Sequence, residues 1–187
     1  TVNEGTEYLV TVPVVVVTKM IRNAEDLDQM AVLSKAAGTR NSKWEGYFAL
    51  ANNVAYNKAF ACFIGGWAEM NKLDKLGGDS LADGRYHGFH GVLDGRGYAI
   101  DGLTVNYWSG GMFLVFGGTI QNIAFTNVVL PGNTGLFGES MAGTIKNVYV
   151  QVKENKVADP DTESNAYTIL GKDAWGVTRV YDTFIDV

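Results

Sequence analysis

The chain has 187 residues, of which 47% are hydrophobic and 19% charged, and its formal net charge is −5. This length and composition indicate one domain with a buried core and exclude a disordered chain of high charge. The acidic balance does not attract a phosphate backbone, so nucleic acid is not an expected partner. Apolar runs such as Val14–Val17 are far too short to span a bilayer. Because Cys62 is the single cysteine, an intrachain disulfide and a thiolate zinc site are also excluded.

Residues 1–20 alternate weakly and then run apolar, a pattern typical of one or two strands. Pro13 places at least part of this segment at a sheet edge, because proline cannot donate to a strand ladder. The chain begins at Thr1 without a signal peptide, so we expect a piece of a longer protein or a processed one. Residues 1–17 are therefore expected to be a strand or linker from a preceding module, and residues 18–187 the main domain.

Residues 23–36 form the one predicted helix. Asn23 suits the N-cap, and Asp26 three residues later completes a pair like a capping box. Gly38 is a natural stop. One face carries the apolar or small residues at helical spacing: Leu27, Met30, Ala31 and Ser34. Such a helix, placed before a run of strands, is suited to cap the open end of a sheet stack.

Residues 46–56 alternate with a period of two, which predicts a strand. One side of this strand carries Phe48, Leu50, Asn52 and Val54, and the other carries Tyr47, Ala49 and Ala51. Residues 57–87 show no clean period and are predicted to be a long insertion with a short helix near 67–76. Long insertions in compact domains are usually functional or disordered.

From Gly91 onward the sequence repeats. Residues 100–105, 120–125 and 145–150 each place apolar residues at positions one, four and six, and residues 180–185 are a weaker copy with Thr183 at position four. Two copies begin with Gly-Thr-Ile-x-Asn, and the residues of this motif are Gly118, Ile120, Asn122, Gly143, Ile145 and Asn147. Second apolar segments lie between the copies, at 112–117, 135–138 and 167–171.

The spacing of these copies is 20, 25 and 35 residues, which fits coils of a solenoid that differ in loop length. We expect the isoleucines to face inward. Position three carries Gly102, Asn122, Asn147 and Asp182, residue types that tolerate a left-handed bend, and stacked asparagines can bond to one another along the axis. The alternative is an antiparallel sandwich of ordinary hairpins, but hairpins do not require the same asparagine at the same offset. The sequence thus predicts an all-β fold, a short right-handed parallel β-helix with one N-terminal capping helix.

Several of these segments resemble a known family. Gly135-Leu-Phe-Gly138, followed by Gly143-Thr-Ile-Lys-Asn-Val148, resembles the GLUG repeat of bacterial surface proteins. Residues 89–103 resemble the coil that commonly precedes this repeat, and residues 21–27 resemble the helical start of the same proteins. The resemblance covers residues 18–187, with 57–87 fitting least.

The resemblance implies a right-handed β-helix in large surface proteins of gut anaerobes, often beside bacterial immunoglobulin-like domains. Similar modules occur in phage virion proteins, so the implied location is the cell surface or a virion. The family supplies no catalytic residue and no cofactor to carry over.

Two aspartates are candidates for catalysis, because paired carboxylates serve glycosidases and β-helices host many enzymes that cleave polysaccharides. Asp94, however, lies in Asp-Gly-Arg-Gly, a turn signal in which an aspartate usually bonds to the backbone of its own turn. Asp101 is the second candidate. The turn interpretation is favoured, and no catalytic residue is predicted.

Metal sites are not predicted either. His87 and His90 are the only histidines, and Gly88 between them argues against the helix that would bring them together. Three aspartates in a glycine-containing stretch, Asp74, Asp79 and Asp83, do not have the spacing of an EF-hand. We interpret them as part of a solvated loop. Cys62 is flanked by Ala61 and Phe63 and is expected to be a small buried apolar residue.

Five aromatic residues are the candidate ligand-binding residues, because they lie in or beside predicted loops: Trp44, Trp67, Tyr86, Tyr107 and Trp108. Aromatic faces stack on sugar rings and give rigid contact area. The alternative is that they cover the ends of the core.

Three functions are compatible with these features. The leading hypothesis is a non-catalytic extracellular module for adhesion or recognition of a surface glycan or protein, or for rigid display. The second is a bacteriophage structural protein of a fibre, tail or capsid decoration, which would form a homo-oligomer or a virion assembly. The third is a carbohydrate-active enzyme like a polysaccharide lyase, although the repeats place Lys146 and Gln121 outward without an acidic and basic cluster.

Overall fold

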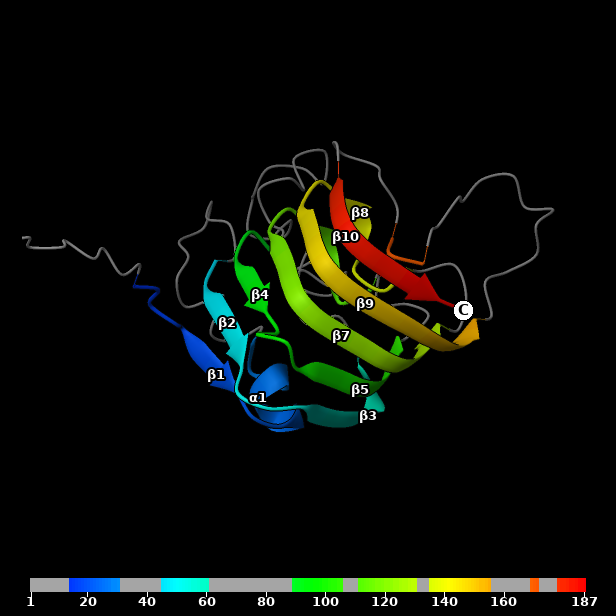
Figure 1. Ribbon diagram of the computed structural model, residues 1–187, viewed down its shortest axis with the longest axis horizontal. Helices are drawn as coiled ribbons and strands as arrows, with labels where there is room; N and C mark the ends of the chain where they lie inside the picture. The colour runs from blue at the N-terminus through cyan, green and yellow to red at the C-terminus, as the bar shows by residue number, and fades with distance from the viewer. Residues whose placement is uncertain are drawn as a thin grey trace, which may run out of the picture.

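The computed structural model describes residues 14–30, 45–60, 89–105, 111–130, 135–155, 169–171 and 178–187. Its elements in chain order are β1 (Lys19–Ile21), α1 (Ala24–Asp28), β2 (Tyr47–Leu50), β3 (Val54–Phe60), β4 (Val92–Asp94), β5 (Ala99–Val105), β6 (Phe113–Phe116), β7 (Thr119–Leu130), β8 (Gly138–Met141), β9 (Thr144–Asn155) and β10 (Arg179–Asp186). The described residues form an all-β structure with one short helix, and its main sheet curls around the core (Figure 1).

The main sheet is parallel throughout. Strand β7 pairs with both β4 and β5 along one edge and with β9 along the other. Beyond β4 and β5 lie β2 and β3, and beyond β9 lies β10. A smaller parallel sheet joins β6 to β8. Successive windings of the chain therefore stack on one another, as in a solenoid. The alternative of an antiparallel sandwich is wrong for the described residues, because none of their strand pairs is antiparallel.

The Gly-Thr-Ile-x-Asn repeat sets the register of the last three windings. Ile120 pairs with Ile145, which in turn pairs with Val180. The residues at positions four and six follow the same register, and Ile120, Ile145 and Val150 are fully buried. The prediction that the isoleucines face the core is confirmed.

The placement of residues 100–105 in this alignment is wrong. Ile100 pairs with Phe125, whereas the partner of Ile120 in the preceding winding is Leu93. The error arises because the pattern occurs twice in one winding: Phe125-Thr-Asn-Val-Val-Leu130 places apolar residues as Ile120-Gln-Asn-Ile-Ala-Phe125 does. Measured from Leu93, the stacked positions are 27, 25 and 35 residues apart.

Each long strand bends at residues with left-handed backbone. The first bend holds Asn122, Asn147 and Asp182, at φ 51°, 52° and 46°. The second bend holds Asn57, Gly102 and Asn127, at φ 46°, 71° and 53°, so Gly102 belongs here and not with the first bend as predicted. The predicted bonding of stacked asparagines is confirmed, since Asn147 Nδ2 donates to Asn122 Oδ1 over 3.0 Å.

We expect Asn147→Ala to lower the free energy of unfolding by about 2 kcal/mol and Asn147→Gly by about 1 kcal/mol. Both variants lose the hydrogen bond to Asn122, but only alanine also bears the steric cost of the left-handed conformation. Urea unfolding of the two variants measures the difference. Equal destabilisation by both substitutions would show that the bend does not depend on backbone freedom.

A column of glycines lines one corner of the windings, at Gly46, Gly91, Gly118 and Gly143. A Cβ atom would lie 2.3 Å from the carbonyl oxygen of Gly46 if added to Gly91, and 2.3 Å from that of Gly91 if added to Gly118. At Gly143 it would lie 2.6 Å from the oxygen of Gly118. Gly118 and Gly143, which open the two Gly-Thr-Ile-x-Asn repeats, are therefore needed because a side chain there would meet the backbone of the preceding winding.

Six fully buried phenylalanines fill the interior: Phe48, Phe89, Phe113, Phe116, Phe125 and Phe137. The rings of Phe89 and Phe113 stack with centroids 4.6 Å apart, and Phe125 meets Phe137 edge-on at 5.2 Å. The contact of Phe125 with Phe137 joins the curled sheet to the small sheet, since Phe125 lies in β7 and Phe137 directly precedes β8. Burial of this many large apolar side chains is the main favourable term in folding.

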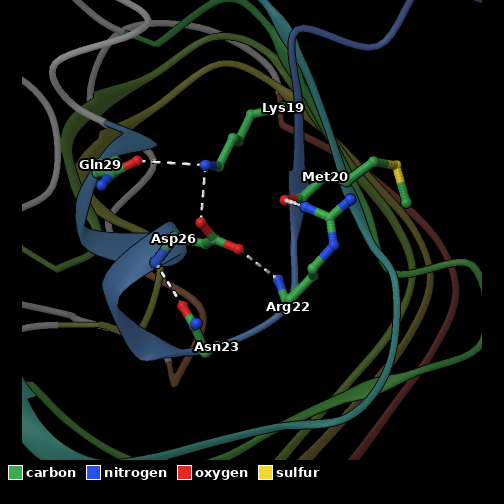
Figure 2. A network of polar contacts seen from close by, with 6 residues as sticks. All are labelled: Lys19, Met20, Arg22, Asn23, Asp26 and Gln29. Atoms are coloured by element: carbon green, nitrogen blue, oxygen red, sulfur yellow. Dashed lines mark hydrogen bonds and ion pairs between the residues drawn. The ribbon is translucent and has the colours of Figure 1, made fainter.

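Helix α1 begins where the sequence predicts, with Asn23 as its N-cap (Figure 2). Asn23 Oδ1 accepts from Asp26 N over 2.8 Å. The other half of a capping box would be a bond from Asn23 N to the Asp26 carboxylate. This part of the prediction is wrong, because the carboxylate instead accepts from Arg22 N over 3.0 Å and pairs with Lys19 Nζ at 2.7 Å. Residues 31–36 of the predicted helix lie outside the described residues. Leu27 is fully buried and anchors α1 to the core.

Two predicted strands differ in position from the observed ones. Residues 1–13 of the first predicted segment lie outside the described residues; of the rest, Val14–Val17 belong to no strand, and β1 begins at Lys19. The single strand predicted at 46–56 is broken at Ala51–Asn53, where Asn52 Nδ2 donates to Arg22 O over 2.9 Å. Asn53 Oδ1 accepts from Ala99 N over 2.9 Å. Side-chain amides thus replace the strand ladder at this corner. Of the predicted insertion 57–87, residues 57–60 belong to β3 and the rest lie outside the described residues.

Candidate functional site

The predicted ligand-binding residues Trp44, Trp67, Tyr86, Tyr107 and Trp108 lie outside the described residues, so their role stays a prediction. The same holds for Cys62, His87 and the three aspartates Asp74, Asp79 and Asp83. His90 is described and half-buried. Within the part of the chain that the structure describes, no group of three or more histidine, cysteine, aspartate or glutamate side chains could hold a metal ion.

Asp94 is the one buried charged residue described, with 7% of its surface exposed at the end of β4. Its Oδ1 accepts from Arg96 N over 2.9 Å and from Asn122 Nδ2 over 3.2 Å. Its Oδ2 accepts from Tyr47 Oη over 2.5 Å and from Gln121 Nε2 over 2.9 Å. The carboxylate therefore joins three windings through four hydrogen bonds.

These bonds set the charge state of Asp94. Burial raises the pKa of its carboxyl group, but the hydrogen bonds from Tyr47, Gln121, Arg96 and Asn122 outweigh burial and leave the pKa below its usual value. The bond to Asp94 in turn raises the pKa of the Tyr47 hydroxyl. The ionised Asp94 carboxylate is therefore the acceptor, and the protonated Tyr47 hydroxyl is the donor. The predicted bond from Asp94 to its own turn is confirmed, and the bonds from Tyr47 and Gln121 were missed.

Asp101 is held in a second, separate arrangement. Its Oδ1 accepts from Thr126 Oγ1 over 2.6 Å and from Asn127 Nδ2 over 2.7 Å, and these bonds lower the pKa of its carboxyl group. A glycosidase needs one carboxyl group whose pKa is raised so that it can act as the general acid. Because both Asp94 and Asp101 have lowered pKa values, their arrangement does not support such a pair.

The outer face of the second half of each winding carries a different set of side chains. Between the buried positions, the register places Ala99, Ala124, Tyr149 and Phe184 next to one another in successive strands. Beside them, Asp101 pairs with Thr126, and Gln151 pairs with Asp186. We call these residues the outer strip. One row of the outer strip is polar. The other row begins with two alanines, Ala99 and Ala124, and ends with two aromatic residues, Tyr149 and Phe184.

The aromatic end of the outer strip is Tyr149 and Phe184. Their rings stack with centroids 6.0 Å apart and planes 9° apart, and Phe184 remains 66% exposed. Tyr149 Oη donates to Asp186 Oδ2 over 3.3 Å. The pair was not predicted, although position five of the aligned repeats carries Ala124, Tyr149 and Phe184. That position alternates with the buried ones, which is the signal that it faces outward.

Comparison with known proteins does not add a family to these observations. No protein-family model matches the chain, and no curated protein or solved structure matches it either. In the described part of the chain, none of the helices has the length and apolar character needed to cross a membrane. The features of the described residues that bear on function are the outer strip, the two bonded aspartates and the stacking of the strands.

Proposed function

We propose that the chain is a non-catalytic recognition module of a cell surface or virion, in which a rigid β-solenoid presents the outer strip to a glycan. The observation that carries this proposal is the stacked pair of half-buried Tyr149 and exposed Phe184 beside a row of polar side chains. The resemblance to GLUG-repeat surface proteins points in the same direction.

The chemistry of the outer strip suits a sugar. The apolar face of a sugar ring stacks on an exposed aromatic face, and its hydroxyl groups need donors and acceptors placed at the rim. Gln151 and Asp186 supply such groups directly beside the aromatic pair. Ala99 and Ala124 leave space next to Tyr149, so a chain of sugars could continue along the polar row.

The rest of the fold provides stiffness. We infer that the stacked windings form a right-handed β-helix, because connections between parallel strands of one sheet are right-handed in about 98% of cases. The glycine column and the asparagine bonds tie each winding to the next in one register. An enzyme is the weaker candidate, because both described aspartates of the proposed pair stay ionised acceptors.

We expect Phe184→Ala to weaken glycan binding about tenfold or more, because it removes the exposed stacking face. A glycan array followed by titration of the best ligand measures the loss. Tyr98→Ala is the matched control, since Tyr98 is also an exposed aromatic residue, at 37%, and lies outside the outer strip.

Two other results would change the proposal. Loss of binding in Trp108→Ala with full binding in Phe184→Ala would move the site to the predicted loop aromatics. Absence of glycan binding by the intact chain would leave rigid display as the function. The virion alternative has separate support, because β10 leaves apolar side chains exposed, as a subunit of an assembly would.

A further inference from the structure

Strand β10 ends the stack with an edge that no described strand covers. Its eight residues pair with β9 on one side only. Val180 continues the column of Ile120 and Ile145, yet it is 47% exposed, and none of the described windings lies over it. Tyr181 is 50% exposed and Val187, which follows the strand, is 76% exposed. An unpaired edge of eight residues that exposes apolar side chains invites pairing with another strand.

The opposite end of the stack is protected, which shows that bare edges are not general in this fold. Strand β1 is only three residues long, and Lys19 within it is held by Asp26 and Gln29 (Figure 2). Strand β3 is covered by α1, where Tyr56 Oη donates to Asp28 Oδ1 over 2.6 Å. Short edges, lysines and covering helices are the usual protections against edge pairing. No described helix covers β10 and it has no lysine, so its charged residues, Arg179, Asp182 and Asp186, are its only protection among the described residues.

The same chain carries an exposed segment suited to this edge. Val14–Val17 belong to no strand, and Val14 and Val16 are 86% and 85% exposed. Valine has high strand propensity, because its branched side chain fits a pleated, half-buried surface. Four consecutive valines in water therefore leave apolar surface exposed that a strand pairing would bury.

Geometry prevents these two parts of one chain from meeting. Thr18 N donates to Tyr47 O over 2.8 Å, which fixes the chain beside β2 immediately after the valines. Val14 can therefore lie at most about 14 Å from that anchor. Strand β10 is five strand spacings from β1, or about 24 Å, and Figure 1 shows the two strands at opposite ends of the row.

We propose that Val14–Val17 of a second copy of the chain add a strand to the free edge of β10. The segment that pairs and the edge that receives it are different surfaces at opposite ends of the molecule. Such a contact is heterologous, so each copy can both give and receive a strand, and the copies join head to tail into open chains. The receiving edge belongs to the strand that also carries Phe184 and Asp186 of the outer strip, but the pairing uses the backbone of β10 and does not require a bound glycan.

Two variants of the 187-residue chain test the proposal. The donor variant carries Val14→Ser, Val15→Ser and Val16→Ser, in a segment outside the strands, so the fold is kept. The acceptor variant carries Val180→Lys and Val187→Lys, because lysine on an edge strand blocks pairing. Light scattering after size exclusion measures the mass of each across a concentration series, and circular dichroism checks the fold.

The unmodified chain is expected to grow with concentration, and the donor variant to associate on the order of a hundredfold more weakly. Each variant alone stays monomeric, but an equimolar mixture forms a one-to-one pair that grows no further, because each supplies what the other lacks. Growth of the donor variant equal to that of the unmodified chain overturns the proposal. An unmodified chain that stays monomeric also overturns the proposal. So does a mixture of the two folded variants that forms no pair, which is the result expected if two β10 edges paired symmetrically.

Discussion

Gly118→Ala is expected to lower the free energy of unfolding by about 3 kcal/mol, although it adds a single methyl group. The added Cβ would lie 2.3 Å from the carbonyl oxygen of Gly91 and 3.0 Å from the backbone carbon of His90. Neither atom can move away easily, because that oxygen accepts from Thr119 N over 2.9 Å in the ladder between windings. Relief of the contact therefore requires two windings to separate.

Gly117→Ala is the matched control for this prediction. The atoms nearest to a Cβ at Gly117 all belong to the His90 side chain and none to the backbone, so we expect a smaller loss, of about 1 kcal/mol. Urea unfolding of both variants measures the contrast between neighbouring positions. A similar loss in both would mean that the cost comes from the flexibility of glycine in the unfolded chain and not from the close approach of windings.

Asp94→Ala is expected to lower the free energy of unfolding by about 3 kcal/mol at neutral pH. The substitution removes an ionised acceptor and leaves donors from Tyr47, Gln121 and Asn122 without their common partner. Gln121→Ala removes only one of these bonds and should cost about 1 kcal/mol. A loss in Asp94→Ala no larger than that in Gln121→Ala would show that the four bonds do not act together.

The contribution of Asp94 to the free energy of unfolding is also expected to depend on pH. Because the pKa of Asp94 is lower in the folded protein than in the unfolded chain, its stabilisation is complete above the unfolded pKa, about 3.9, and is lost as the pH falls through the folded value. The gap in stability between the unmodified chain and Asp94→Asn should therefore narrow in acid. Unfolding curves from pH 6 down to about pH 2 test this. A gap that stays constant over that range would mean that Asp94 is not ionised in the fold.

The sequence predicted the fold where one residue type repeats for one physical reason. The asparagines at the bends were identified because few residues tolerate left-handed backbone, and both Asn122 and Asn147 adopt it. The alignment failed at Gly102, because the two bends of one winding produce the same local pattern. Only the register between strands, which depends on distant residues, separates the two bends.

The polar cluster around Asp94 could be predicted only in part. The bond to Arg96 N is local, and the turn sequence indicates it. The bond from Tyr47 joins residues 47 positions apart, and no spacing rule connects them before the order of the strands is known. The outer strip was not predicted for a different reason. The repeat was identified from its inward apolar positions, whereas Tyr149 and Phe184 occupy the outward position that alternates with them.

The unequal spacing of stacked positions has a consequence for how such a chain can vary. Ile120 and Ile145 stack across 25 residues, whereas Phe48 and Leu93 stack across 45. The entropy of closing a loop grows only with the logarithm of its length, so this difference costs about 0.5 kcal/mol, less than one hydrogen bond. Segments between windings can therefore lengthen or shorten during evolution at almost no thermodynamic cost, while the stacked positions keep their order.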